Sequence, residues 1–398
     1  MERTQVGIIG AGPAGLVLAA RLAAAGIDST ILESRSRAYV EGRVRAGVLE
    51  APTVALLAEL GVDGRLRRQG LVHDGVYLQW QQQRHRIDFK ELAGQRVTVY
   101  GQQELVCDLI AARLAEQRPL RFDAEVVAAE GALAPLPARP DGGVRLRWRE
   151  AGGTVEELVC DVVAGCDGFH GISRSLVGPD ALEVWDRSYP YAWLGILADV
   201  APSTDELIYS FHERGFAMHS MRSPTVSRLY LQVAPDENID HWPDERIWEE
   251  LQVRLGLPGW TLRAGPVREK GVTPMRSYVA APMHHGRLFL AGDAAHIVPP
   301  TGAKGLNLAV ADVKVLSDAL VDWYAGGSST GMDCYSDRCL SRVWRVQDFS
   351  TWMTTLLHLD PGGDPFDRRP QRSRQDELAR SRALATNLAE NYVGLPFA

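Results

Sequence analysis

The sequence has little cysteine, no excess of basic residues and no long apolar run. Its five cysteines show none of the paired spacings that bind zinc, and their odd number favours reduced thiols. With 43 basic and 50 acidic residues the net charge is −7, which argues against general nucleic-acid binding. The longest apolar stretch, 16–27, contains Arg21 and is too short to span a bilayer. We therefore expect no metal site, no nucleic-acid partner and no membrane span.

Targeting and repeat signals are also missing. Glu2 and Arg3 lead directly into an apolar segment instead of a secretory leader, so we expect a cytoplasmic protein. The 398 residues, 45% hydrophobic and 23% charged, are typical of a globular enzyme and sufficient for two or three domains.

The first ordered pattern is a strand, a glycine-rich turn, a helix and a second strand. Residues 5–9 and 29–32 are predicted to be strands, and they flank a helical segment of small and branched apolar residues that ends near residue 25. This order is typical of the βαβ unit that opens a Rossmann-like dinucleotide-binding domain.

The turn itself, Gly10-Ala-Gly-Pro-Ala14-Gly15, carries the spacing that such a site requires. Gly10 permits the tight turn, Gly12 lets a pyrophosphate approach the backbone, and Gly15 allows close helix packing. Glu33 follows 18 positions after Gly15 and can accept hydrogen bonds from a ribose.

Two further clusters lie far along the chain, Asp167-Gly168 and Gly292-Asp293-Ala294-Ala295. One dinucleotide that needs all three clusters would explain them together. We therefore predict a dinucleotide-binding part at 1–180, completed by a segment at 286–398 that includes C-terminal helices.

Between these parts the pattern changes to short alternating strands at 192–198, 207–212, 215–221 and 228–233. Period-two alternation predicts an antiparallel sheet at 181–285 as a substrate domain. After residue 305 the periodicity is helical, at 305–324, 335–358 and 371–390. The expected fold class is α/β, of mixed α+β character.

Polar side chains repeat at spacing two on neighbouring strands of that sheet. Ser220 and Arg222 share one face, as do Arg228 and Tyr230. With a turn of five residues, Ser220 would oppose Tyr230 and Arg222 would oppose Arg228. Two facing arginines repel unless an anion lies between them, so a carboxylate clamp is one interpretation. An ordinary sheet surface is the other.

Four longer runs are more specific than any glycine motif: 43–50, 165–174, 286–307 and 390–396. The chain resembles the 4-hydroxybenzoate 3-monooxygenase family of single-component FAD-dependent aromatic hydroxylases, and the resemblance runs end to end. It implies FAD as cofactor, NADPH or NADH as electron donor, O₂ and a small aromatic acid as substrates, and a homodimer. The implied reaction hydroxylates 4-hydroxybenzoate at C3 to 3,4-dihydroxybenzoate through a flavin C4a-hydroperoxide.

Carried over by position, the resemblance assigns flavin contacts to the three clusters, to the loop near residue 45 and to a later helix start. These residues are Gly10, Gly12, Ala14, Gly15, Glu33, Arg43, Val44, Arg45, Ala46, Gly47, Val48, Gln102, Asp167, Asp293, Leu306 and Asn307.

The resemblance also assigns the substrate pocket. Its implied substrate-binding residues are Tyr209, Ser220, Met221, Arg222, Tyr230, Pro300 and Thr301. Its implied catalytic residues are Tyr209 and Tyr392, which pass the phenol proton, His73, which ends that route, and Arg228, which stabilises the phenolate.

The nicotinamide contacts are less specific and comprise Arg35, Tyr39, His170, Arg174 and Arg276. Ser34 stands where family members that prefer NADPH often carry a basic residue, so the choice between NADPH and NADH stays open.

Three alternatives remain. The same chemistry could act on 4-aminobenzoate or 3,4-dihydroxybenzoate, with His219, Met221 and Leu229 beside the clamp altering the pocket. A flavin oxidase or desaturase would not transfer oxygen. A non-catalytic binding protein could have kept the Rossmann shell, and it would be colourless.

Overall fold

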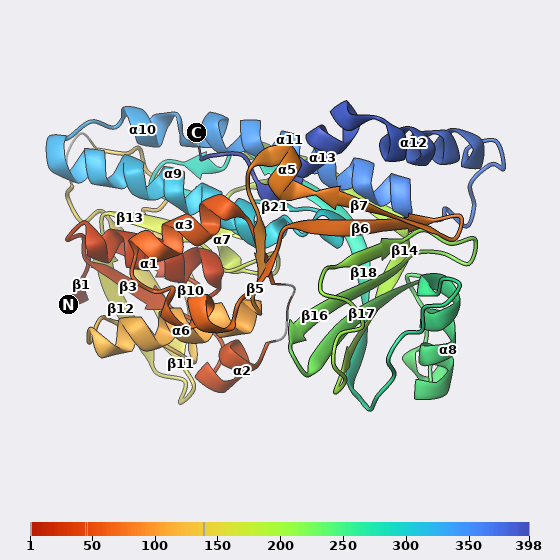
Figure 1. Ribbon diagram of the computed structural model, residues 1–398. Helices are drawn as coiled ribbons and strands as arrows, with labels where there is room; N and C mark the ends of the chain where they lie inside the picture. The colour runs from red at the N-terminus through yellow and green to blue at the C-terminus, as the bar shows by residue number, and fades with distance from the viewer. Residues whose placement is uncertain (1, 44, 46, 138–139, 398) are drawn as a thin grey trace.

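A computed structural model describes residues 2–43, 45, 47–137 and 140–397. The expected flavin contacts Val44 and Ala46 lie outside these residues. Figure 1 shows two sheet-containing regions side by side, with the helices of the C-terminal third across the top. The fold is mixed α/β, as predicted.

The Rossmann-like sheet has six strands, and all its neighbouring pairs are parallel except the pair at one edge. Its strands, in spatial order, are β19 (His284–His285), β20 (Leu288–Leu290), β13 (Val162–Gly165), β2 (Val6–Ile9), β3 (Ser29–Leu32) and β9 (Leu120–Arg121). Every residue of β2, β3, β13 and β20 is buried, because helices or other strands cover both faces.

The second large sheet has eight strands and is antiparallel apart from the pair β15/β6. Its order is β21 (His296–Ile297), β18 (Val267–Ala281), β14 (Glu183–Ala198), β17 (Val226–Val233), β16 (Ala217–Ser223), β15 (Ile208–Ser210), β6 (Gly75–Trp80) and β7 (Gln83–Asp88). Segments from all three predicted spans therefore contribute strands to this sheet, and the boundaries 1–180, 181–285 and 286–398 stay a prediction.

Two smaller sheets support the larger ones. One contains β1 (Glu2–Arg3), β12 (Val155–Cys160), β11 (Val144–Glu150) and β10 (Ala124–Glu130), and the other β4 (Val48–Leu49), β8 (Val97–Val99) and β5 (Leu71–His73).

The predicted register of the clamp hairpin is wrong by two residues. Ser220 pairs with Arg228 and not with Tyr230. The connecting turn holds only residues 224–225, and Arg222 lies in a bulge without a partner in the ladder. A bulge inserts one unpaired residue and re-aims its side chain, which the alternation of polar residues does not reveal.

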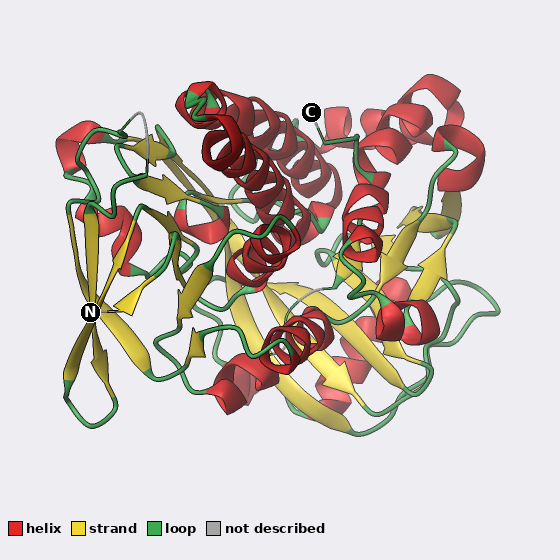
Figure 2. Ribbon diagram, turned by 90° about the vertical axis from the view of Figure 1, so that its left-hand side faces the viewer, coloured by secondary structure: helices red, strands yellow, loops and turns green. Residues whose placement is uncertain are grey.

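The long helices α9 (Gly305–Gly326) and α11 (Tyr335–Leu357) match the predicted segments. The third predicted helix, 371–390, is instead two helices, α12 (Arg368–Arg380) and α13 (Arg382–Val393). Ser381 separates them because its backbone is extended and its hydroxyl accepts from the Leu384 N–H at 3.3 Å, capping α13. Long helices lie above the strands in Figure 2, and shorter helices lie below and beside them.

The remaining helices are shorter and join the sheets. They are α1 (Pro13–Ala24), α2 (Arg37–Gly42), α3 (Ala51–Glu59), α4 (Gly64–Gln69), α5 (Phe89–Ala93), α6 (Gln102–Ala115), α7 (Ile172–Leu176), α8 (Asp244–Leu255) and α10 (Thr330–Asp333). In the described part of the chain, no helix is long and apolar enough to cross a membrane.

An aromatic-rich apolar cluster lies between the eight-stranded sheet and the helices α5, α11, α12 and α13. It includes Tyr209, Met221, Tyr230, Phe349 and Tyr392. Several predicted pocket residues, distant in sequence, therefore share one buried region.

Candidate active site

The three predicted dinucleotide clusters meet at one edge of the six-stranded sheet. Gly10 follows β2, Asp167 follows β13, Gly292 follows β20, and Glu33 follows the neighbouring strand β3. Because these four strands are adjacent and parallel, their carboxyl ends lie together. Ligands of open α/β sheets bind in the crevice at that edge.

The first turn requires glycine at two positions and leaves open space at a third. A Cβ on Gly10, whose φ is +103°, would lie 2.5 Å from the Cys166 carbonyl oxygen. A Cβ on Gly15 would lie 2.1 Å from the Gly10 carbonyl oxygen, whereas one on Gly12 would meet nothing within 4 Å. The N-terminus of α1 thus faces a space without side chains, which suits a pyrophosphate.

Glu33 is oriented by backbone donors. One carboxylate oxygen accepts from the Ala11 N–H at 2.7 Å and the other from the Arg35 N–H at 2.8 Å. The oxygen bound by the Ala11 N–H accepts no other bond among the described residues, so the side chain can still accept from a ribose hydroxyl.

Asp167 offers an unsatisfied acceptor at the second cluster. Its Oδ2 accepts from the Ser173 N–H at 2.8 Å and the Ser173 hydroxyl at 2.9 Å. Its Oδ1 is buried and has no partner among the described residues. Burial raises the pKa of this carboxyl group. A buried acceptor without a donor is costly, so a ligand donor would stabilise it.

The start of α9 supplies backbone donors on the far side of the crevice. The Asn307 side chain binds the opposite loop, accepting from the Glu50 N–H at 2.9 Å and donating to the Val48 carbonyl at 2.9 Å. The Leu308 N–H donates to the Lys304 carbonyl, which is the first intrahelical hydrogen bond. The backbone N–H groups of Leu306 and Asn307 precede it in the first turn, so helix geometry gives them no intrahelical acceptor. They can bind an electronegative edge of a ring system.

Other predicted flavin contacts lie in the loop before β4 and at the start of α6. Gly47 packs against the start of α6, where a Cβ would lie 2.0 Å from the Tyr100 carbonyl oxygen, and Gln102 is the first residue of that helix. Arg45 interacts electrostatically with Arg43 and with Asp293. Open space, free backbone donors and an unpaired acceptor together fit FAD.

An arginine cluster surrounds Tyr230 on the neighbouring sheet. Burial raises the pKa of Tyr230, but the positive charges of Arg228 and Arg222 lower it by more, so its pKa lies below the usual value of a tyrosine. The Nε atoms of Arg222 and Arg228 and Nη1 of Arg228 are buried and have no partner in the described ranges. Buried cationic donors without acceptors favour an anionic ligand, here a carboxylate.

Two contacts tie this cluster to its surroundings. Arg222 Nη2 donates to the Arg45 carbonyl at 3.2 Å, which connects the clamp to the flavin loop. The Ser220 hydroxyl donates to the Arg228 carbonyl at 3.0 Å, so it must rotate before it can donate to a substrate carboxylate. Of the suggested flanking residues, His219 and Leu229 pair with each other and alternate with Ser220 and Arg228, which turns them to the opposite face.

Tyr209 and Tyr392 form a buried hydrogen-bonded pair. Their hydroxyl oxygens are 2.7 Å apart and each side chain is 1% exposed. Burial raises the pKa of both phenols, so both stay neutral at physiological pH. A pair of neutral hydroxyls can exchange donor and acceptor roles and thereby transmit a proton.

His73 lies buried at the end of β5, and burial lowers its pKa to about 4. Neither ring nitrogen has a hydrogen-bond partner in the part of the chain that is described. The structure therefore brings the two tyrosines into contact but records no direct bond from them to His73.

The loop before α9 carries the remaining pocket residues. The Pro300 carbonyl accepts from the Ala303 N–H at 2.9 Å and keeps one lone pair for another donor. Thr301 is fully buried, and its hydroxyl accepts from Thr354 at 2.8 Å.

The predicted nicotinamide residues form two separate groups. Arg174 and Arg276 both lie over the rings of Phe169 and Tyr278, at 4.5–5.4 Å, and His170 touches Phe169 edge-on. Arg35 lies over Tyr39 at 5.4 Å, on the exposed segment after Glu33.

Reasoning from residue patterns missed two polar contacts around the pocket. Lys304 Nζ donates to Glu50 at 2.6 Å and to the Tyr392 carbonyl at 2.9 Å. Trp193 Nε1 donates to His358 at 2.7 Å behind Tyr230. Lys304 lay inside the family-like run 286–307, whereas nothing in the sequence marked His358.

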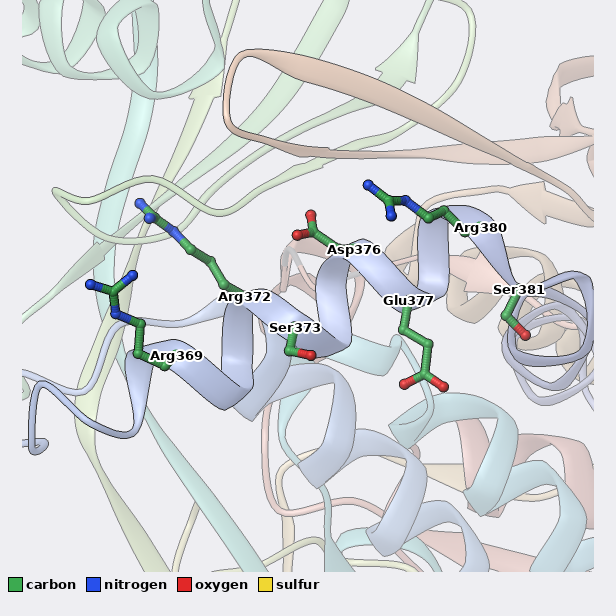
Figure 3. A pocket seen from close by; sticks show the side chains of 7 residues that line it. All are labelled: Arg369, Arg372, Ser373, Asp376, Glu377, Arg380 and Ser381. Carbon is green, nitrogen blue, oxygen red and sulfur yellow. The ribbon is translucent and has the colours of Figure 1, made fainter.

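A separate surface hollow of about 680 Å³ lies over α12. It is lined by Arg369, Arg372, Ser373, Asp376, Glu377, Arg380 and Ser381 (Figure 3). Most of these charged side chains are exposed, and they take no part in the site described above.

Comparison with known proteins agrees with this geometry. The FAD binding domain family matches residues 3–350. The p-hydroxybenzoate hydroxylase of Acinetobacter baylyi is 47% identical over 400 residues, covering 99% of this chain and 96% of that protein.

The chain belongs to the FAD-dependent aromatic monooxygenases.

More distant members of this family share the architecture. The 3-amino-4-hydroxybenzoate 2-monooxygenase PtmB3 of Streptomyces platensis is 28% identical and covers 80% of each chain. The p-nitrophenol 4-monooxygenase PnpA of Pseudomonas putida DLL-E4 superposes with a TM-score of 0.83 over 99% of both chains at 22% identity, which supports the fold. FAD is the cofactor of the family, and NAD(P)H is its usual electron donor.

Proposed function

We propose that this monooxygenase hydroxylates 4-hydroxybenzoate at C3, with NADPH or NADH as electron donor. The observation that carries the proposal is the pairing of two unlike groups in one buried region. Arg222 and Arg228 have buried guanidinium nitrogens without partners beside Tyr230, and Tyr209 with Tyr392 offers a neutral hydroxyl pair. A benzoate with a hydroxyl para to its carboxylate would bind the arginines through the carboxylate and the tyrosine pair through the hydroxyl. The 47% identical relative is named for this substrate.

The chain's own residues would bind, orient and deprotonate the substrate. Arg222, Ser220 and Tyr230 would bind the carboxylate, and the Pro300 carbonyl and Tyr209 would bind the phenol. A proton leaving the phenol would pass to Tyr209 and then Tyr392, with His73 as the proposed end of the route. Bound FAD would supply electron transfer from NAD(P)H and activation of O₂. Deprotonation matters because a phenolate is electron-rich at its ortho carbon.

The cofactor cradle would use the three clusters. The turn Gly10–Gly15 would hold the pyrophosphate, Glu33 a ribose, Asp293 the ribityl chain, and the α9 start the ring. A nucleotide phosphate contact at Arg174 and Arg276 is proposed from family resemblance. A homodimer is proposed from family resemblance.

The test is turnover of substituted benzoates. Purified yellow enzyme is incubated with 4-hydroxybenzoate, 4-aminobenzoate or 3,4-dihydroxybenzoate and each nucleotide, and both NAD(P)H oxidation and hydroxylated product are measured. We expect one molecule of hydroxylated product per molecule of NAD(P)H oxidised with 4-hydroxybenzoate, and not with the other two acids. Product from another acid in its place would transfer the proposal to that acid, and nucleotide oxidation with no hydroxylated product would overturn it.

A further inference from the structure

Gly195, near the C-terminal end of β14, faces the arginine cluster. It pairs with Tyr230 on β17 and with Gly271 on β18, so all three positions lie on one face of the sheet. A Cβ on Gly195 would lie 2.8 Å from Arg228 Nη2 and 3.4 Å from a Tyr230 ring carbon. Gly195 itself is buried.

Backbone conformation does not explain this glycine. Its φ lies outside the left-handed region, so an L-residue could adopt it. Glycine inside a strand loses packing and conformational entropy, and such a residue often marks the close approach of another group. Here that group is the Arg228 guanidinium.

We infer that Gly195 is a positioning residue, which leaves the space that lets the Arg228 guanidinium lie against the sheet beside the Tyr230 hydroxyl. Two of the three Arg228 guanidinium nitrogens, Nε and Nη1, have no partner among the described residues, so few contacts besides this space hold the group in place. An added methyl would push Nη2 outward, toward the proposed substrate. The inference rests on the proposed function, because its consequence for activity runs through Arg228.

The collision is one that the fold can accommodate. The atom met at 2.8 Å is the end of a flexible side chain, and the Tyr230 contact at 3.4 Å is ordinary van der Waals distance. Gly195→Ala should therefore fold normally while displacing Arg228. Misplacing a positioned group by a fraction of an ångström to 1 Å costs about 10- to 100-fold in rate.

Gly271 provides a matched control. It is the direct ladder partner of Gly195 on β18, but a Cβ there would meet nothing within 4 Å. Gly271→Ala makes the same chemical change in the same sheet without touching Arg228. Any general effect of alanine on the strands should appear in both variants.

The experiment compares Gly195→Ala and Gly271→Ala, each in the wild-type and the Arg228→Ala background. We expect Gly195→Ala to lower kcat/KM for 4-hydroxybenzoate by about tenfold, with the midpoint of thermal unfolding unchanged, and Gly271→Ala to stay within about twofold. In the Arg228→Ala background, Gly195→Ala should cause no further loss. The inference would be overturned if Gly195→Ala lowered kcat/KM by the same factor in the Arg228→Ala background as in the wild type. Equal losses of kcat/KM in Gly195→Ala and Gly271→Ala would also overturn it.

A crystal structure of Gly195→Ala separates this inference from the proposed function. Arg228 displaced from its wild-type position supports the positioning role even if 4-hydroxybenzoate proves not to be the substrate. An unmoved Arg228 overturns that role whatever the enzyme hydroxylates.

Discussion

Replacement of Tyr209 by phenylalanine removes one hydroxyl from the buried pair and little else. The two hydroxyl oxygens are 2.7 Å apart, and the Tyr392 hydroxyl would lose that partner. An unsatisfied buried hydroxyl costs about 1–3 kcal/mol of the free energy of unfolding. Arg222 and Tyr230 are untouched and only one neutral hydrogen bond to the phenol is lost, so the dissociation constant for 4-hydroxybenzoate should rise by about two- to tenfold.

The rate of hydroxylation should respond far more strongly. A positioned group that transfers a proton contributes about 10²–10⁴-fold to rate. Product formed per NAD(P)H consumed should therefore fall, and the pKa of the bound phenol, followed by its absorbance, should rise. Both are measured on the same preparation, with urea unfolding as the measure of stability.

Tyr189→Phe is the matched control. Tyr189 is also buried in the aromatic-rich cluster, and its hydroxyl bonds Ser277 at 3.0 Å and Thr351 at 3.2 Å instead of the tyrosine pair. It should lose comparable stability and keep its activity. If Tyr209→Phe made as much product per NAD(P)H as the wild type, the proton route through Tyr209 and Tyr392 would be refuted.

Three further changes test other parts of the molecule. Arg222→Gln should weaken 4-hydroxybenzoate binding about 10- to 100-fold, measured by flavin fluorescence. If the variant weakened binding of the neutral amide analogue, 4-hydroxybenzamide, by the same factor, the carboxylate clamp would be contradicted. Gly12→Val should fill the space before α1 and yield colourless but folded protein; retained flavin absorbance would contradict the cradle. Burial lowers the pKa of His73 and His219 to about 4 and of His358 to about 3. The unfolded chain then binds more protons below pH 6.5, so the free energy of unfolding should fall between pH 6.5 and 4, by about 1.4 kcal/mol per pH unit for each histidine, whereas a flat urea-unfolding profile would contradict neutral buried histidines.

The dinucleotide crevice could be predicted because its signals are local. Gly10, Gly12 and Gly15 all act within one turn, and β3 begins and ends at the predicted residues, 29–32. The meeting of Asp167 with that turn followed from parallel strand order, which a βαβ opening favours.

The clamp could not be placed from the sequence with the same accuracy. Polar alternation identified Ser220, Arg222, Arg228 and Tyr230, but their register depended on a bulge at Arg222, and a bulge has no compositional signal there. Gly195 could not be identified from the sequence, because the side chain that needs its space, Arg228, is 33 positions away and comes close only in the folded sheet.

The charge balance of the clamp bears on how the proposed substrate would lose its proton. A phenol with a pKa near 10 needs about 3–4 kcal/mol in favour of its anion to ionise near pH 7 to 8. Arg222 and Arg228 bring two positive charges, and the substrate carboxylate would neutralise one. A single remaining charge about 6 Å away contributes roughly 3 kcal/mol at an effective dielectric constant near 20. The arginine whose charge the carboxylate does not neutralise therefore supplies nearly all the free energy needed to ionise the phenol. The Tyr209 hydroxyl can supply the rest as a donor to the phenolate. On this reasoning Arg228→Lys, which keeps the charge, should retain most of the pKa shift of the bound phenol, whereas Arg228→Ala should remove most of it.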